Sequence, residues 1–152
     1  MDTDTGHIRV LKLASAFDVG KVINRQQCQA QVVGGVVQGL GSAIHEKFVF
    51  QDGRLVNNSF SDYKIPTAKD IPAEMVQFFV ETPHPQGPYG ARGVAEHPMI
   101  SVPSVIGNAL TNATGVEFFE LPLDPERVYL TLKHAAEGRT QPVKETAGVA
   151  GG

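Results

Sequence analysis

The sequence predicts an α+β fold, in which a mixed sheet with hairpins accompanies two longer helices and a short C-terminal helix. Segments with strand and helix patterns alternate along the 152 residues, but without the regular spacing of βαβ units. Turn-forming residues are abundant, with 16 glycines and 10 prolines. The apolar fraction of 41% is ordinary for a globular chain, so we expect one hydrophobic core.

The first expected strand covers residues 7–14, where apolar and polar side chains alternate imperfectly. A tight turn at 4–6 precedes it, which predicts that the chain starts within a hairpin. The strand is expected to end before Gly20. The first long helix is expected over 25–45, because Asn24 is a good N-cap and apolar residues then recur every three or four positions.

A second hairpin follows this helix. Strand-like residues 47–51 and 54–56 flank Asp52-Gly53, which is a strong turn pair. Residues 75–81 form the clearest strand pattern, because they are rich in β-branched and aromatic side chains.

The second long helix is expected over 99–114, with an early interruption at Pro103 and a stop at Gly115. A last short helix is expected near 125–134, because Asp124 is an N-cap residue followed by proline at the first helical position.

Composition and charge limit the classes of function. The formal net charge of -3 and the scattered basic residues argue against nucleic acid or an anionic membrane as partner. The apolar run 32–40 is too short to span a bilayer, and the first residues lack a signal-peptide pattern, so a cytoplasmic protein is expected. Cys28 is the only cysteine, which excludes an internal disulfide. Residues 137–152 have no apolar period and are expected to be a flexible tail after a folded segment, 1–136.

The first long helix carries an unusual number of glycines: Gly34, Gly35, Gly39 and Gly41. Each costs roughly 0.8–1 kcal/mol relative to alanine inside a helix. Close packing against a sheet or a cofactor would offset this cost. Gln31 and Gln38 lie seven residues apart and therefore on one face of the helix. Either both amides are solvated, or one reaches a polar ligand.

A glycine-punctuated loop leads from Gly90 to Glu96 and then to a helix-like run. Gly90 and Gly93 can adopt positive φ, and they would let another backbone or a cofactor approach closely. Such a loop can present the Glu96 carboxylate to a cleft. The alternative is that Glu96 is an ordinary acid in the first turn of a helix, where the helix dipole favours it.

Other site chemistries find little support in the sequence. The glycine run 34–41 lies inside a helix, so it is not a dinucleotide-binding fingerprint. His45-Glu46 lacks the second histidine of a zinc peptidase. A zinc site formed by His84, Glu96 and His97 is the remaining metal hypothesis.

Four blocks of sequence, in this order, carry a family resemblance: Asp18-Val-Gly20, Gln31-Val-Val-Gly-Gly-Val-Val-Gln-Gly-Leu-Gly41, Tyr63-Lys-Ile-Pro-Thr67 and Gly90-Ala-Arg-Gly-Val-Ala-Glu96. Together they resemble the C-terminal part of the molybdenum-binding large subunit of the xanthine dehydrogenase, aldehyde oxidase and carbon monoxide dehydrogenase family. The resemblance implies that 1–136 is the C-terminal segment of a larger molybdopterin-binding domain. It also implies hydroxylation of an aldehyde or N-heterocycle carbon with water-derived oxygen, using a molybdenum cofactor such as molybdopterin cytosine dinucleotide.

The resemblance assigns roles to individual residues. Glu96 matches the carboxylate beside molybdenum that acts as general base. Gln31 matches a glutamine whose amide binds the cofactor, and Gly34 and Gly35 would let the helix approach that cofactor closely. Gln38 receives no role from the resemblance.

Two residues depart from the family pattern. Ala95 stands where the family usually has glycine, directly before the catalytic glutamate, and Arg92 stands where lysine is commoner. We expect Ala95 to change how Glu96 is oriented, and a contact made by the family lysine is not carried over unchanged to Arg92.

Family members have a much longer molybdenum subunit, so the expected partners are the remainder of that subunit and the iron–sulfur and flavin subunits. The resemblance implies that the cofactor is held only in the assembled complex and that the chain alone is inactive. Exposed apolar surface predicts self-association of the isolated chain. The competing hypothesis is a non-catalytic assembly domain that retains the family fold.

Overall fold

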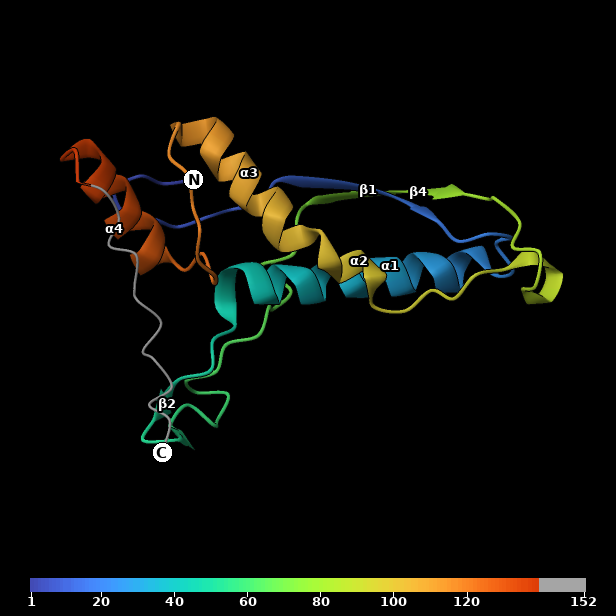
Figure 1. Ribbon diagram of the computed structural model, residues 1–152, viewed down its shortest axis with the longest axis horizontal. Coiled ribbons are helices and arrows are strands. Elements are labelled where there is room, and N and C mark those ends of the chain that lie inside the picture. The colour runs from blue at the N-terminus through green and yellow to red at the C-terminus, as the bar shows by residue number, and fades with distance from the viewer. Residues whose placement is uncertain (140–152) are drawn as a thin grey trace, which may run out of the picture.

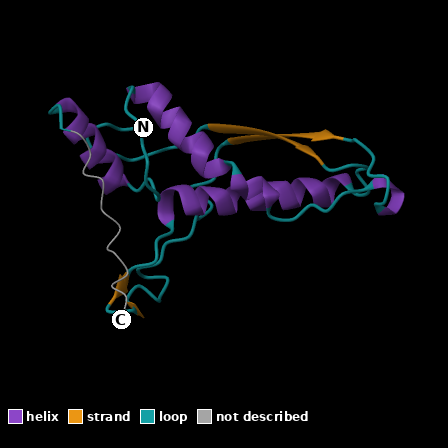
Figure 2. Ribbon diagram, in the orientation of Figure 1, coloured by secondary structure: helices purple, strands orange, loops and turns teal. Residues whose placement is uncertain are grey.

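The computed structural model describes residues 1–139, so most of the predicted tail at 137–152 lies outside the described residues. Within these residues, ten elements follow one another: β1 (Lys12–Asp18), α1 (Arg25–Leu40), the π-helical turn η1 (Gly41–His45), β2 (Phe50–Gln51), β3 (Arg54–Leu55), β4 (Glu74–Val80), the 3₁₀ turn η2 (Pro88–Gly90), α2 (His97–Ile100), α3 (Val102–Thr114) and α4 (Pro125–Ala136). The predicted α+β class is confirmed (Figure 2). In the described part of the chain, no helix is long and apolar enough to cross a membrane.

The two sheets each have two strands. β1 and β4 pair in parallel, with Lys12 opposite Glu74 and Asp18 opposite Val80. β2 and β3 form the predicted antiparallel hairpin around Asp52-Gly53. Residues 1–139 therefore contain one parallel and one antiparallel two-stranded sheet, rather than a single mixed sheet.

The first strand differs from the prediction in its bounds and its partner. The turn at the N-terminus is confirmed, with Gly6 at φ 72° and its N–H donating to the carbonyl of Asp2. However, the strand begins at Lys12 rather than His7, and it pairs with β4 rather than within a hairpin. A distant partner decides these bounds, because strand limits depend on where a neighbouring strand offers hydrogen bonds.

Helix α1 begins where the sequence predicts, but it ends at Leu40, and the last predicted residues, 41–45, form the π-helical turn η1. The Asn24 side chain accepts a hydrogen bond from the N–H of Gln27, which satisfies one of the first donors of the helix. Val32, Val36 and Leu40 recur at spacings of four and are buried. The helix therefore turns one apolar face inward while it runs alongside the β1–β4 pair (Figure 1).

The glycines of α1 permit close packing, but the neighbours are helices α2 and α3. A Cβ atom at Gly35 would lie 2.9 Å from the Cβ of Pro98, and one at Gly39 would lie 2.7 Å from the Cβ of Val102. Such contacts are too short for a side chain, so the glycines set the distance between α1 and the two following helices. The expected close packing is present at Gly35 and Gly39, but it is made with helices rather than with the sheet or the cofactor that the sequence suggested.

The core joins these helices to the C-terminal part of the chain. The side chains of the main hydrophobic cluster are Leu13, Val32, Val36, Leu40, Ala43, Ile44, Val102, Ile106, Leu110, Leu123 and Val128. Burial of a large apolar side chain contributes about 1.5–3 kcal/mol, so this cluster is the main stabilising feature. Gly115, at φ 73°, ends α3 as predicted, and the side chain of Asp124 caps α4 by accepting from the N–H of Arg127.

An apolar arm extends away from this core. We define the arm as residues 47–67, which include the β2–β3 hairpin and project from the end of α1 (Figure 1). Phe48, Phe50 and Phe60 are 61%, 63% and 77% exposed. At its base, the Tyr63 hydroxyl donates to the Glu46 carboxylate, which raises the pKa of Tyr63.

Candidate functional site

The segment that leads to Glu96 crosses the molecule to reach α1. After β4 the chain turns through η2 and then runs back beside α1 as far as α2 (Figure 1). Glu96 occupies the N-cap position of α2, with φ -99° and ψ -3°, and its side chain makes no capping hydrogen bond. Glu96 therefore lies at the expected loop-to-helix junction, but its carboxylate does not cap the short helix α2 that follows.

Two glutamines of α1 contact this segment. The amide nitrogen of Gln31 donates to the backbone carbonyl of Ala95 over 3.0 Å. The amide nitrogen of Gln38 donates to Oε1 of Glu96 over 3.1 Å. The shared face predicted from their spacing is thus correct, and both amides bind the loop rather than only solvent.

Gly34 and Gly35, between these glutamines, lie in different surroundings. Gly35 is buried beneath Pro98, whereas Gly34 is exposed and has no heavy atom within 4 Å of the place where a Cβ would stand. Gly35 therefore brings the loop close to α1. Gly34 leaves an open patch of helix backbone beside Gln31 and Gln38.

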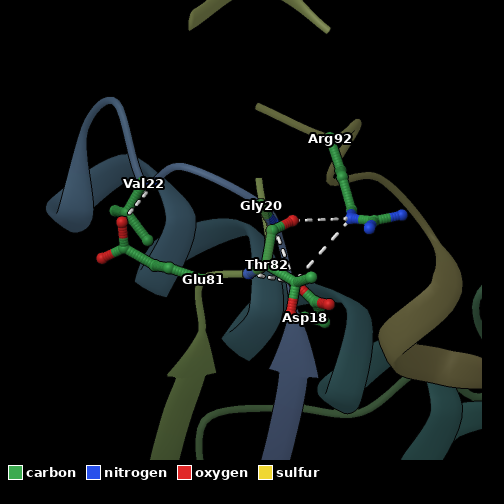
Figure 3. Close-up of polar contacts among 6 residues, drawn as sticks. All are labelled: Asp18, Gly20, Val22, Glu81, Thr82 and Arg92. Carbon is green, nitrogen blue, oxygen red and sulfur yellow. Dashed lines mark hydrogen bonds and ion pairs between the residues drawn. The ribbon is translucent and has the colours of Figure 1, made fainter. Parts of the chain in front are cut away.

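A polar clamp at the end of the β1–β4 pair holds the start of the loop (Figure 3). Oδ1 of Asp18 accepts hydrogen bonds from the N–H groups of Gly20 and Thr82, over 3.0 and 3.1 Å. Nε of Arg92 lies 3.7 Å from the same oxygen and donates to the carbonyl of Thr82 over 3.3 Å. One carboxylate thus connects the ends of both strands with the loop that leads to Glu96.

The backbone reinforces this clamp. The N–H of Arg92 donates to the carbonyl of Val19, and the N–H of Lys21 donates to the carbonyl of Gly90, each over 2.9 Å. Gly90 uses the positive φ that glycine permits, with φ 81°, whereas Gly93 is not among the positive-φ glycines. The loop is bound at its first residues by β-bridge geometry, and only Gly90 needs the left-handed conformation.

Both acids at this end of the sheet are stabilised as anions. The N–H donors of Gly20 and then Thr82 lower the pKa of Asp18, with a smaller contribution from Arg92. The ammonium of Lys21, followed by the N–H of Val22, lowers the pKa of Glu81, whose Oε2 lies 3.1 Å from Lys21 Nζ. Both carboxylates therefore act as fixed acceptors at neutral pH.

Sequence reasoning missed two residues of this arrangement, Asp18 and Gln38. A signal existed for Gln38, because its spacing from Gln31 placed it on the same helix face. Asp18 lay in a block that resembled the family, but its function as an acceptor depends on Thr82, which is 64 residues away. Arg92, noted as a departure from the family pattern, proves to be part of the clamp.

The residues of the zinc hypothesis do not converge. His97 packs edge-on against the ring of Phe17, with 5.1 Å between ring centroids. Nδ1 of His84 accepts a hydrogen bond from the N–H of Gln86. Residues 1–139 contain no group of three or more His, Cys, Asp or Glu side chains arranged to hold a metal ion.

Comparisons with known proteins agree with the fold. Residues 1–72 match the model of a molybdopterin cofactor-binding domain. The chain is 35% identical over 134 residues to the 6-hydroxypseudooxynicotine dehydrogenase complex subunit gamma of Paenarthrobacter nicotinovorans. The aligned region covers 85% of this chain and 17% of that protein. It is 36% identical over 135 residues to the aldehyde oxidoreductase of Megalodesulfovibrio gigas, covering 88% of this chain and 14% of the relative.

Solved structures show the same likeness. The aldehyde oxidoreductase from Desulfovibrio gigas superposes with a TM-score of 0.78 at 34% identity, over 87% of this chain and 14% of that one. A copper- and molybdenum-containing CO dehydrogenase superposes with a TM-score of 0.82 at 26% identity, over 90% of this chain and 18% of that one.

The fold and these matches together identify a segment of a molybdopterin cofactor-binding domain. The chain belongs to the family of molybdenum-binding subunits of xanthine dehydrogenases, aldehyde oxidoreductases and carbon monoxide dehydrogenases. It spans between 14% and 17% of the length of the curated relatives that it matches.

Proposed function

We propose that this chain is part of a molybdenum hydroxylase and contributes Glu96 as the general base to a site that another stretch of polypeptide completes. The observation that carries the proposal is the placement of the Glu96 carboxylate. It caps no helix end, and it is held beside an open face of α1 by Gln38. A carboxylate supported in this way can accept a proton from a reacting group near that face.

The residues of that face are suited to a large polar cofactor. Gly34 leaves room for close approach to the helix backbone, and the amide of Gln31 has a carbonyl oxygen in addition to the N–H that binds Ala95. Gln31 and Gly34 would hold the cofactor, while Gly35 would set the distance of the loop through Pro98. When bound, the molybdenum cofactor, proposed in its cytosine dinucleotide form, supplies the redox chemistry of the hydroxylation.

Within this proposal, the chain's own contribution is to bind, orient and move a proton. The clamp at Asp18 holds the start of the loop, Gln31 holds the carbonyl before Glu96, and Oε2 of Glu96 accepts the proton. The substrate class is an aldehyde or an N-heterocycle, which accords with an aldehyde oxidoreductase and a nicotine 6-hydroxylase among the relatives.

The proposed partners are the remainder of a molybdenum-binding large subunit and the iron–sulfur and flavin subunits of such a complex. The small share of each relative that this chain spans supports the first partner, and the names of two relatives, a complex subunit gamma and a large subunit, support a multi-subunit assembly. Activity and cofactor retention are therefore expected only in the complex.

The decisive test is Glu96→Gln in the assembled, molybdenum-loaded protein. The amide retains the shape of the side chain but cannot accept the proton, so we expect turnover to fall by about 10²–10⁴-fold. Molybdenum content, measured by mass spectrometry of the metal, should stay unchanged. Turnover close to that of the unaltered protein would refute the general-base role and favour the non-catalytic assembly domain.

A further inference from the structure

The Glu96 carboxylate accepts a hydrogen bond from a neutral side-chain amide. Gln38 donates to Oε1 of Glu96 over 3.1 Å, although the two residues are 58 positions apart. Both side chains are exposed in this chain, so the contact is not forced by burial. A hydrogen bond between two exposed side chains forms only if the backbones that carry them, here at Gln38 and Glu96, are held at a suitable distance.

The packing on either side of Gln38 supplies this distance. Pro98 packs against Gly35, one turn before Gln38. Val102 and the carbonyl of Met99 pack against Gly39, directly after Gln38. These contacts lie on the inner side of α1 and fix the start of α2 against the helix. The length of a glutamine side chain then spans the remaining gap to Glu96.

We propose that Gln38 is the positioning residue for Glu96: its amide holds Oε1, so that Oε2 remains to accept the proton. This inference rests on the proposed function of Glu96. A neutral donor suits the task, because it orients the carboxylate through a hydrogen bond and places no positive charge beside it. Gln31 complements it by holding the carbonyl of the preceding residue, Ala95.

The test compares Gln38→Met with Gln26→Met in the assembled, molybdenum-loaded protein. Methionine is similar in length to glutamine and favours helix, but it offers no donor. Loss of a hydrogen bond to a charged group predicts a decrease in kcat of about 10- to 100-fold with little change in KM. Gln26 lies exposed near the start of the same helix, so Gln26→Met should behave like the unaltered protein.

The split between kcat and KM separates positioning from a merely structural role. Loss of the donor alone should lower kcat, whereas a distorted α1 should also change KM. A lower kcat with unchanged KM supports the proposal, and an unchanged kcat in Gln38→Met overturns it.

A crystal structure of assembled Gln38→Met provides a result that does not depend on turnover. We expect the Glu96 carboxylate to be displaced or to occupy more than one conformer, while α1 and α2 keep their separation. An undisturbed carboxylate would overturn the positioning role.

The Glu96→Gln variant, measured in parallel, separates the two proposals. If Glu96→Gln abolishes turnover and Gln38→Met retains normal kcat, only the inference about Gln38 fails. If Glu96→Gln itself turns over normally, the proposed function fails, and the inference fails with it.

Discussion

At the scale of the residue, Gly34 and Gly35 are neighbours in α1 with opposite surroundings. Gly34 faces open space, whereas a Cβ at Gly35 would meet Pro98 at 2.9 Å. Gly35→Val should therefore destabilise the protein by about 1–3 kcal/mol through overpacking, and Gly34→Ala should stabilise it by up to about 1 kcal/mol through helix propensity. Thermal unfolding of the assembled protein measures both effects.

The same pair tests the cofactor-binding role predicted for Gly34. A methyl group there would occupy the open patch between Gln31 and Gln38, so we expect Gly34→Ala to retain less molybdenum despite its greater stability. A stabilised variant with full molybdenum content would remove Gly34 from the set of cofactor-binding residues.

At the scale of the element, the clamp around Asp18 makes the loop at 90–96 sensitive to acid. The folded pKa of Asp18 is lowered from 3.8 by the N–H groups of Gly20 and Thr82. Its ionised form therefore stabilises the clamp at pH values above 3.8, and this contribution is lost as the pH falls through the lower, folded pKa. Hydrogen exchange in the 90–96 segment, corrected for its intrinsic pH dependence, should accelerate over this acidic range.

The matched variant for the clamp is Asp18→Asn, which keeps an acceptor oxygen but does not titrate. We expect its loop to exchange faster than the unaltered protein at neutral pH and to lose the additional acid dependence. Identical pH dependence in both proteins would show that another group controls the opening of this loop.

At the scale of the whole molecule, the arm at 47–67 exposes large apolar side chains, which we expect a partner polypeptide to cover. Burial of one phenylalanine side chain is worth about 1.5–3 kcal/mol, so replacing both Phe50 and Phe60 by serine should weaken assembly with the remainder of the large subunit by at least about 100-fold. Arg54→Ser, a polar change on the same hairpin, is the control. Titration of the separately produced subunit pieces, followed by analytical ultracentrifugation, measures the affinity.

The isolated chain should also self-associate through the arm, and the double serine variant should do so less. Normal assembly of that variant with its partner would show that the arm is not a docking surface. A cytoplasmic location remains a prediction from the sequence.

Local signals in the sequence alone were enough for most elements. Asn24 and Asp124 identified two helix starts, Gly115 identified a helix end, and Asp52-Gly53 identified the hairpin, because caps and turns depend on residues within four positions of one another. The family resemblance was carried by short blocks for the same reason. Glu96 could be singled out because its loop has a local pattern.

Only the tertiary structure decided how these elements meet. Three contacts join segments that are far apart in the chain: the parallel pairing of β1 with β4, the packing of Pro98 on Gly35 and the hydrogen bond from Gln38 to Glu96. Such contacts depend on how the core packs and on distances that no local pattern encodes. The identity of the candidate base was therefore a property of the sequence, whereas its orientation depends on the fold.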